Sequence, residues 1–517
     1  GSVGYRFSEE NYFQPLKSWW SNGKLRASYG HIGNEAVGDN MFLSTVSRIA
    51  NNRSTGYVNW LNGDQYMTMY NMPTLVSSSL TWERIVTTDV GLDLGFFDNS
   101  FNVSFDWYQR DTKDMLGPLS ALPSVLGAGA PYGNAGELRT RGWELSLSWN
   151  HSFGDWDVYA TANIGDARTK INKWNDTNRL MYTFLPKSGN YTEGQYFGDI
   201  VGFETDGYYT MDDFNFVPGT QIFDKDGNPV LGPNGLPTYT RGTYVPKDGV
   251  VDQSALQTGD FVFGPGDIRF KDINNDGLIN NGDPNMKDAD GKTIAVGSVR
   301  NHGDLKVIGN ALPRYEYSFR IGGAWKGFDL DLFFQGVGQR KMWATGSTIT
   351  PMAQSALGTF TNLPEQGYNN LTYIDNSEDP NNGMITDAQI SDSNWYPRLY
   401  SGCVGAGSIG NIGIGQYNFY PQSKYLTNLA YLRFKNLTFG YTLPANITQK
   451  ALIQKARIYF SADNLCFLYN GAKKYQLDPE MTTGISSSVQ GYNDGYGGFG
   501  RTIPIPRTFS FGIQVTL

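Results

Sequence analysis

The sequence predicts an all-β chain that forms part of a transmembrane antiparallel β-barrel with long extracellular loops. Three observations support this fold class. Apolar residues alternate with polar ones in many short segments, aromatic residues stand at the ends of these segments, and short connections alternate with long ones. Glycine is abundant, with 62 residues, and only 17% of residues are charged, which fits a turn-rich β chain better than a helical one.

The alternating segments follow one another along the chain. In residues 101–107, Phe and other apolar residues occupy every second position, as expected of a strand with one apolar and one polar face. We expect about ten to fourteen strands, each near the length of about 9–11 residues that crosses a bilayer. Other clear examples lie at residues 90–96, 143–149, 156–164, 315–325, 328–334 and 509–517.

One predicted strand departs from the alternation. Within residues 431–439 the apolar phase slips near Lys435. A β-bulge, which inserts one extra residue into a strand, would produce such a slip. The alternative is a strand whose inner face is also buried.

Aromatic residues mark both ends of several segments. Trp143 and Trp149 bound one of them, and Phe101 and Trp107 bound another. Amphipathic rings are enriched at the two interfaces of a membrane, whereas the core of a soluble β-sandwich more often holds aliphatic residues there. The aromatic positions therefore favour a membrane barrel.

The connections between segments fall into two size classes. Tight turns are expected at residues 97–100, 151–155 and 326–327. Outer-membrane barrels combine short periplasmic turns with long extracellular loops, whereas a sandwich has no reason to gather its long loops at one end. The large extracellular loops are expected at about residues 31–80, 111–138, 168–313, 339–429 and 468–505.

Composition excludes two other classes of protein. No apolar run approaches the roughly 18 residues of a transmembrane helix. The net charge of −8, without a basic stripe, argues against a nucleic-acid partner. The chain begins with a strand-like segment rather than a signal peptide, so we expect residues 1–517 to be the C-terminal portion of a longer barrel protein.

Several motifs occur in a fixed order along the chain. Their order and spacing resemble the SusC/RagA-like TonB-dependent transporters of Bacteroidetes outer membranes. Tyr431–Pro444 is the most telling of these motifs. The others are residues 2–10, Leu25–Gly30 with Gly33 and Asn34, Asn134–Glu137, Arg141–Leu145, Gly266–Asp272 with Asn274, Asp276 and Gly277, Ala462–Leu465, Leu477–Glu480 and Pro506–Phe509.

The resemblance implies a TonB-dependent barrel of about 22 strands in the outer membrane of a Gram-negative bacterium. It implies active import of oligosaccharides, or of oligopeptides, by a channel subunit that works with a SusD-like surface lipoprotein as a lid and is energised through TonB. The plug and the segment that engages TonB have no counterpart here and are expected outside this chain. A secreted or surface all-β protein for glycan binding or adhesion is the alternative from a different class.

A calcium loop is the sharpest local motif. Oxygen-bearing residues occupy positions 1, 3, 5, 9 and 12 of a loop that has glycine at position 6 and would use a backbone carbonyl at position 7. The ion would have a structural role. The alternative is an Asn/Asp/Gly-rich turn that needs no ion. The candidate ligands are Asp272, Asn274, Asp276, Leu278, Asn280 and Asp283.

No arrangement of residues indicates catalysis. The three histidines lie far apart in sequence, and carboxylates are expected along a wet lumen in any case, so we predict that the chain is not an enzyme. Loop aromatics are candidate contacts for substrate or lid, although packing within the loops is the default interpretation for any one of them. They are Trp60, Tyr66, Trp343, Trp395, Tyr396, Tyr492 and Tyr496.

Overall fold

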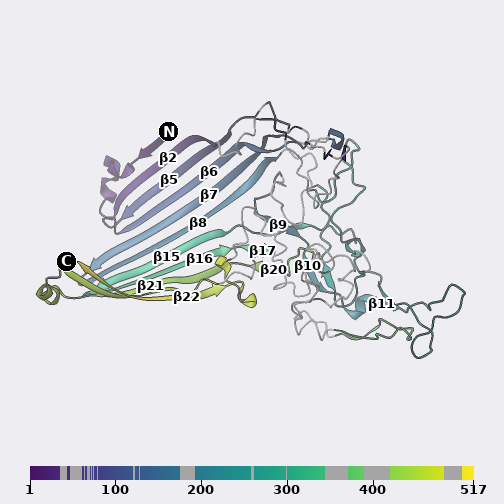
Figure 1. Ribbon diagram of the computed structural model, residues 1–517. Helices are drawn as coiled ribbons and strands as arrows, with labels where there is room; N and C mark the ends of the chain where they lie inside the picture. The colour runs from purple at the N-terminus through teal and green to yellow at the C-terminus, as the bar shows by residue number, and fades with distance from the viewer. Residues whose placement is uncertain are drawn as a thin grey trace.

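A single antiparallel sheet of eleven strands dominates the computed structural model (Figure 1). The eleven strands are arranged in the sheet in the same order as along the chain. Each strand therefore pairs with the strand before it and the strand after it, in an up-and-down arrangement. The remaining short strands lie in the long connections and do not belong to this sheet. The edge strands are β1 and β23. In sheet order the strands are β1 (Ser2–Tyr5), β2 (Trp20–Asn34), β5 (Glu83–Phe96), β6 (Phe101–Pro118), β7 (Tyr132–Phe153), β8 (Trp156–Trp174), β15 (Arg314–Trp325), β16 (Phe328–Gln339), β21 (Tyr431–Thr442), β22 (Lys455–Asn470) and β23 (Thr508–Thr516).

The expected all-β fold is confirmed. The structure describes residues 1–34, 81–119, 129–174, 193–257, 261–298, 300–343, 371–388, 420–481 and 504–516, with short pieces of 43–80, 123–126, 397 and 418. The one α-helix in these parts is α2 (Ala445–Thr448), between β21 and β22. No described helix is long and apolar enough to cross a membrane.

The two faces of the sheet differ in chemistry, as the alternation requires. Trp107 pairs with Trp143 and Phe105 with Leu145, whereas the intervening Asp106 pairs with Glu144. We call these the apolar face and the polar face. Rings also stack across strands on the apolar face, where the Trp156 and Trp325 centroids lie 5.2 Å apart. Such cross-strand pairs stabilise the sheet and fix its register.

Tyrosine rings on the polar face cover glycines of the next strand. A Cβ added at Gly142 would lie 2.5 Å from the Tyr108 ring, and one added at Gly512 would lie 2.3 Å from the Tyr459 ring. A glycine in a strand often marks such a close approach. These glycines therefore serve packing rather than turn formation.

The tight turns gather at one end of the sheet and the long connections at the other (Figure 1). Residues 97–99 adopt positive φ in the turn between β5 and β6, and Gly154 does so between β7 and β8. The predicted bounds of the loop at residues 111–138 were wrong. β6 extends to Pro118 and β7 starts at Tyr132, so the connection near residues 111–138 is shorter than predicted. Continued pairing up to Pro118 opposite Tyr132 explains the difference.

The bulge predicted near Lys435 is confirmed. On one side of β21, Phe333 pairs with Asn436 but Phe334 pairs with Phe434, so Lys435 is the extra residue. The pairing with β22 shifts at the same place. The inserted residue explains why the apolar phase slips in this strand.

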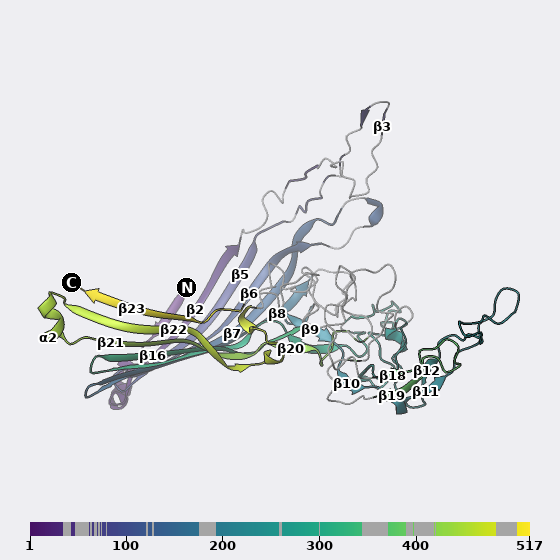
Figure 2. The same ribbon diagram turned by 60° about the horizontal axis from the view of Figure 1, so that its bottom comes forward.

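A body of short strands and turns stands at the end of the sheet with the long connections (Figure 2). It has its own hydrophobic core, in which Phe203, Phe270, Ile268 and Tyr425 are almost fully buried. We call it the loop body. Its two-stranded sheets pair β9 (Asp199–Gly202) with β14 (Lys306–Asn310), β10 (Thr205–Tyr208) with β13 (Ile268–Phe270), β11 (Phe214–Val217) with β12 (Thr243–Pro246), and β18 (Leu371–Tyr373) with β19 (Ile385–Ala388). Two further pairs are β17 (Lys341–Trp343) with β20 (Leu426–Asn428), and β3 (Leu61–Asn62) with β4 (Gln65–Tyr66).

Candidate functional site

Ion pairs cross-link neighbouring strands on the polar face. Arg26 of β2 donates from Nε to Asp93 of β5 at 2.7 Å, and its Nη1 lies 3.0 Å from Asp106 of β6. One guanidinium thus joins three strands. All three side chains remain about one-third exposed, so each pair adds at most about 1 kcal/mol to stability.

The same chemistry continues across the later strands. Arg320 of β15 donates from Nε to Asp331 of β16 at 3.0 Å, and the Tyr159 hydroxyl also bonds to Asp331. Arg457 of β22 donates from Nε to Asp329 at 2.8 Å. The polar face is therefore a wall of paired charges and hydroxyls, which suits a water-filled or plugged lumen.

A buried ion cluster lies near the start of β21, at the end of the sheet that faces the loop body (Figure 1). Arg433 is only 2% exposed. Its Nη2 lies 2.6 Å from Asp478, its Nε lies 3.2 Å from Glu480, and its guanidinium carbon lies 4.0 Å above the Phe467 ring. Lys435 completes the cluster with a contact of 2.5 Å to Glu480. Two cations and two carboxylates therefore balance, and the Arg433–Asp478 pair among them is almost fully shielded from water.

The bulge at Lys435 makes this cluster possible. Arg433 pairs with Gln335 and Asn436 pairs with Phe333, so both face the polar side although they are three residues apart. Without an inserted residue, residues three apart in a strand would face opposite sides. The slip in the alternation is thus the local cause of the buried arginine.

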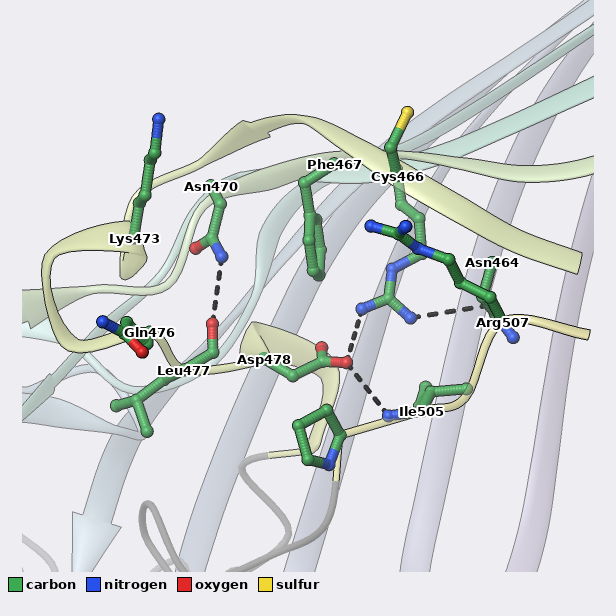
Figure 3. A pocket seen from close by; sticks show the side chains of 12 residues that line it. Asn464, Cys466, Phe467, Asn470, Lys473, Gln476, Leu477, Asp478, Ile505 and Arg507 are labelled. Atoms are coloured by element: carbon green, nitrogen blue, oxygen red, sulfur yellow. Dashed lines mark hydrogen bonds and ion pairs between the residues drawn. The ribbon is translucent and has the colours of Figure 1, made fainter.

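A hollow of about 340 Å³ lies beside the cluster. Asp478 accepts the backbone N–H of Ile505 at 3.3 Å (Figure 3). Asn464 donates to the Pro506 carbonyl at 3.3 Å. Asp478 follows β22 and Ile505 precedes β23, so the first bond joins the two ends of their connection, and the ion pair between Asp478 and Arg433 holds them against β21. We call Arg433, Lys435, Asp478 and Glu480 the anchor cluster.

The loop body is held together by buried polar side chains as well as by its apolar core. Asp267 is fully buried and accepts the N–H of Gly264 and an amide N–H of Asn418, both at 2.8 Å. Gln253, also buried, donates to the Ile268 carbonyl and accepts from the Phe270 N–H at 3.0 Å. A buried network in which every polar group has a hydrogen-bond partner makes the fold rigid and favours a single packing of the core.

The predicted calcium loop lies in the loop body. Both carboxylate oxygens of Asp272 accept backbone N–H groups of the loop, and Asp276 accepts that of Leu278. Asp304, which the sequence did not single out, is fully buried beside the loop and accepts the N–H groups of Ile273 and Asn280. Burial raises the pKa of Asp304, and the nearby charges of Asp272 and Asp276 raise it further.

The loop offers hard oxygen donors, as Ca²⁺ requires. Within the described ranges, however, no three side chains of His, Cys, Asp or Glu gather as a metal site. An ion there would depend on amide and backbone oxygens as well as carboxylates. Asn274 donates to Asp276 at 2.9 Å, Asn280 accepts from the Gly282 N–H, and Asp283 accepts from that of Asn285.

The predicted aromatic contacts are not brought together in the described part of the chain. The backbones of Tyr66 and Trp343 lie in β4 and β17, which belong to different two-stranded sheets. The remaining five lie outside the described residues, namely Trp60, Trp395, Tyr396, Tyr492 and Tyr496.

Residues 1–245 match a family model described as TonB dependent receptor-like, beta-barrel. TonB-dependent receptor P3 of Formosa agariphila is 24% identical over all of this chain and 41% of its own length. TonB-dependent receptor SusC of Bacteroides thetaiotaomicron is 25% identical over 44% of this chain and 22% of its own length.

A solved structure shares the fold. In the "Structure of the RagAB peptide transporter", one chain superposes with a TM-score of 0.58 at 22% identity. The match covers 99% of this chain and 43% of that chain. The chain thus spans about two fifths of the length of P3 and of this structural relative.

Proposed function

We propose that this chain is part of the β-barrel of a SusC/RagA-like TonB-dependent receptor in the outer membrane of a Gram-negative bacterium, and that it forms the channel wall of an active importer. The cargo is an oligosaccharide or, as the alternative, an oligopeptide. Uptake is energised through TonB. The observation that carries the proposal is the polar face cross-linked by ion pairs such as Arg26–Asp93, opposite an apolar face with aromatic ends.

The remaining parts of the importer would come from residues outside this chain. β1 and β23 are edge strands of the sheet. Open edges pair readily with other strands, and closure of a barrel removes them. We propose that residues 1–517 are the C-terminal portion of the barrel and that further strands and a plug complete it.

A SusD-like lipoprotein is the proposed lid over the loop body. The loop body stands at the end of the sheet opposite the tight turns (Figure 2), which is the extracellular end of an outer-membrane barrel. Because the loop body has its own hydrophobic core, it can present a rigid surface for a partner to bind. Trp60, Tyr66, Trp343, Trp395, Tyr396, Tyr492 and Tyr496 remain the proposed contacts to substrate or lid.

Uptake by cells tests the proposed function. Cells that carry or lack the complete gene would receive labelled oligosaccharides or oligopeptides of matched size, with and without a functional TonB. We expect TonB-dependent uptake of one cargo class only. Equal uptake by cells that lack the gene would contradict the proposal.

The named relatives are receptors and transporters, and we propose no covalent chemistry for the chain.

Structural calcium in the loop body is a separate proposal. Its support is the spacing of oxygen donors from Asp272 to Asp283 and the buried Asp304 beside them. Calorimetry on the complete protein should detect Ca²⁺ binding below millimolar concentration, and the double substitution Asp272→Asn with Asp276→Asn should abolish it. Asp224→Asn with Asp226→Asn, in another turn of the loop body, is the matched control. Absence of heat from the unsubstituted protein at millimolar Ca²⁺ would refute the proposal.

A further inference from the structure

The apolar face carries a group of cations near the loop body. Arg141 of β7 pairs with Arg168 of β8, and Arg139 pairs with Lys170. These positions lie two and four residues beyond Trp143, so they share its face of the sheet. We call Arg139, Arg141, Arg168 and Lys170 the basic group.

The basic group follows directly on an aromatic pair. Trp107 and Trp143 are partners across β6 and β7, and the next pair on the same face is Gln109 with Arg141. In an outer-membrane barrel, aromatic residues at this height mark the boundary between acyl chains and headgroups. This inference rests on the proposed function, in which the loop body lies at the extracellular end of the barrel. In that orientation the basic group lies at the level of the headgroups of the outer leaflet.

Two cations of the group carry charge that the protein does not neutralise. The Nε of Arg141 donates to the neutral Gln109 side chain at 2.8 Å. Both Arg141 and Lys170 are exposed, and neither forms an ion pair within the described part of the chain. Adjacent like charges across strands are destabilising unless an anion lies between them.

The other two cations are held in place by neighbours. Arg139 pairs with Asp111, with 2.6 Å between Nε and Oδ1. The Arg168 guanidinium carbon lies 3.5 Å from the centre of the Tyr196 ring, and its Nη2 is 3.9 Å from Asp199. The basic group is therefore partly preorganised, which lowers the cost of binding a ligand.

A hollow of about 230 Å³ opens between the aromatic pair and the cations. The residues that line it include Trp107, Trp143, Arg141, Arg168 and Lys170. Asp166 also lines it, and this carboxylate is ion-paired with Arg314. Guanidinium groups bind phosphate through paired N–H donors, and an ammonium adds a point charge. Indole rings beside them would contact the apolar part of the same ligand.

We propose that the basic group binds the phosphates of the phosphorylated glycolipid of the outer leaflet, with the tryptophan pair against its acyl chains. The ligand is amphipathic, with phosphates at one end and acyl chains at the other. The hollow likewise has cations on one side and indole rings on the other. A free phosphate would use the cations but not the indole rings. The structure therefore favours the lipid over a soluble anion.

Native mass spectrometry of the complete protein in mild detergent tests the inference. The probe is bis-phosphorylated lipid A, and the test variant is Arg141→Gln with Lys170→Gln. Each surface cation near an anionic membrane contributes about 1 kcal/mol, so losing two should weaken binding about thirty-fold. The control is Lys24→Gln with Arg110→Gln, which removes the same charge from the polar face of β2 and β6.

Three outcomes would overturn the inference. They are equal lipid A binding by the test and control variants, equal binding of dephosphorylated lipid A, and displacement of lipid A by inorganic phosphate at an equal phosphate concentration. Heat-modifiable migration shows that each variant is folded. Cargo uptake is measured separately on the unsubstituted protein. If that protein binds no lipid A but takes up cargo, this inference alone is refuted; if it binds lipid A but takes up no cargo, only the importer is refuted.

Discussion

Replacing Arg433 with Met is the most informative perturbation of the fold. Methionine fills a similar volume but leaves the carboxylates of Asp478 and Glu480 facing each other with only Lys435 for compensation. Arg433 and Asp478 have side-chain exposures of 3% and 5%, so solvent cannot replace the lost cation. Breaking a buried ion pair by removing one partner costs about 3–5 kcal/mol. We therefore expect a loss of stability of that size around the anchor cluster.

Hydrogen exchange of the complete protein in detergent measures this loss locally. Peptides that contain residues 477–481 and 504–507 should exchange faster by a factor of about 100 or more, because opening free energies set exchange rates. The matched control is Arg457→Met, whose partner is Asp329. That pair is more exposed, at 21% and 32%, and its loss should cost about 1 kcal/mol or less. Equal exchange in the two variants would refute the reasoning.

Two further predictions concern packing and pH. Gly142→Ala should lower the midpoint of heat-induced gel mobility change, because its Cβ would collide with the Tyr108 ring, with a cost of about 1–3 kcal/mol. Gly30→Ala, which meets no atom within 4 Å, is the control, and an equal shift in both would contradict the packing explanation. In the loop body, hydrogen bonding to Lys306 holds the pKa of Glu204 below its ordinary value of 4.5. The folded state thus gains stability from Glu204 above pH 4.5 and loses it as the pH falls through the lowered pKa. The protection factors of β14 amides, which are corrected for the intrinsic slowing of exchange at lower pH, should fall on acidification, and Glu204→Gln should remove that part of the pH dependence. An unchanged pH profile in the variant would show that the pair is irrelevant.

The strands of the sheet were readable from local sequence. Alternation reports which residues share a face, and a strand keeps that property whichever neighbour it pairs with. The bulge at Lys435 was readable for the same reason, since an extra residue shifts the phase of everything after it. The end of β6 was misplaced because the polar segment near Pro118 gives no local sign that pairing continues.

The anchor cluster could not be predicted in the same way. Arg433 lies in the strand whose alternation slips near Lys435, but its partners Asp478 and Glu480 lie beyond the next strand. They were noted only as part of a family motif. Nothing in the local pattern states that the segment after β22 folds back onto β21.

The sequence by itself determined that this protein is a β-sheet with one apolar and one polar face, with tight turns at one end and large loops at the other. These properties depend on residues close together along the chain. Only the tertiary structure decided which charges meet. The anchor cluster, the basic group on β7 and β8, and the position of Asp304 beside the predicted calcium loop all depend on register between distant segments. Register is set by the sum of many weak cross-strand contacts, so no single motif reveals it.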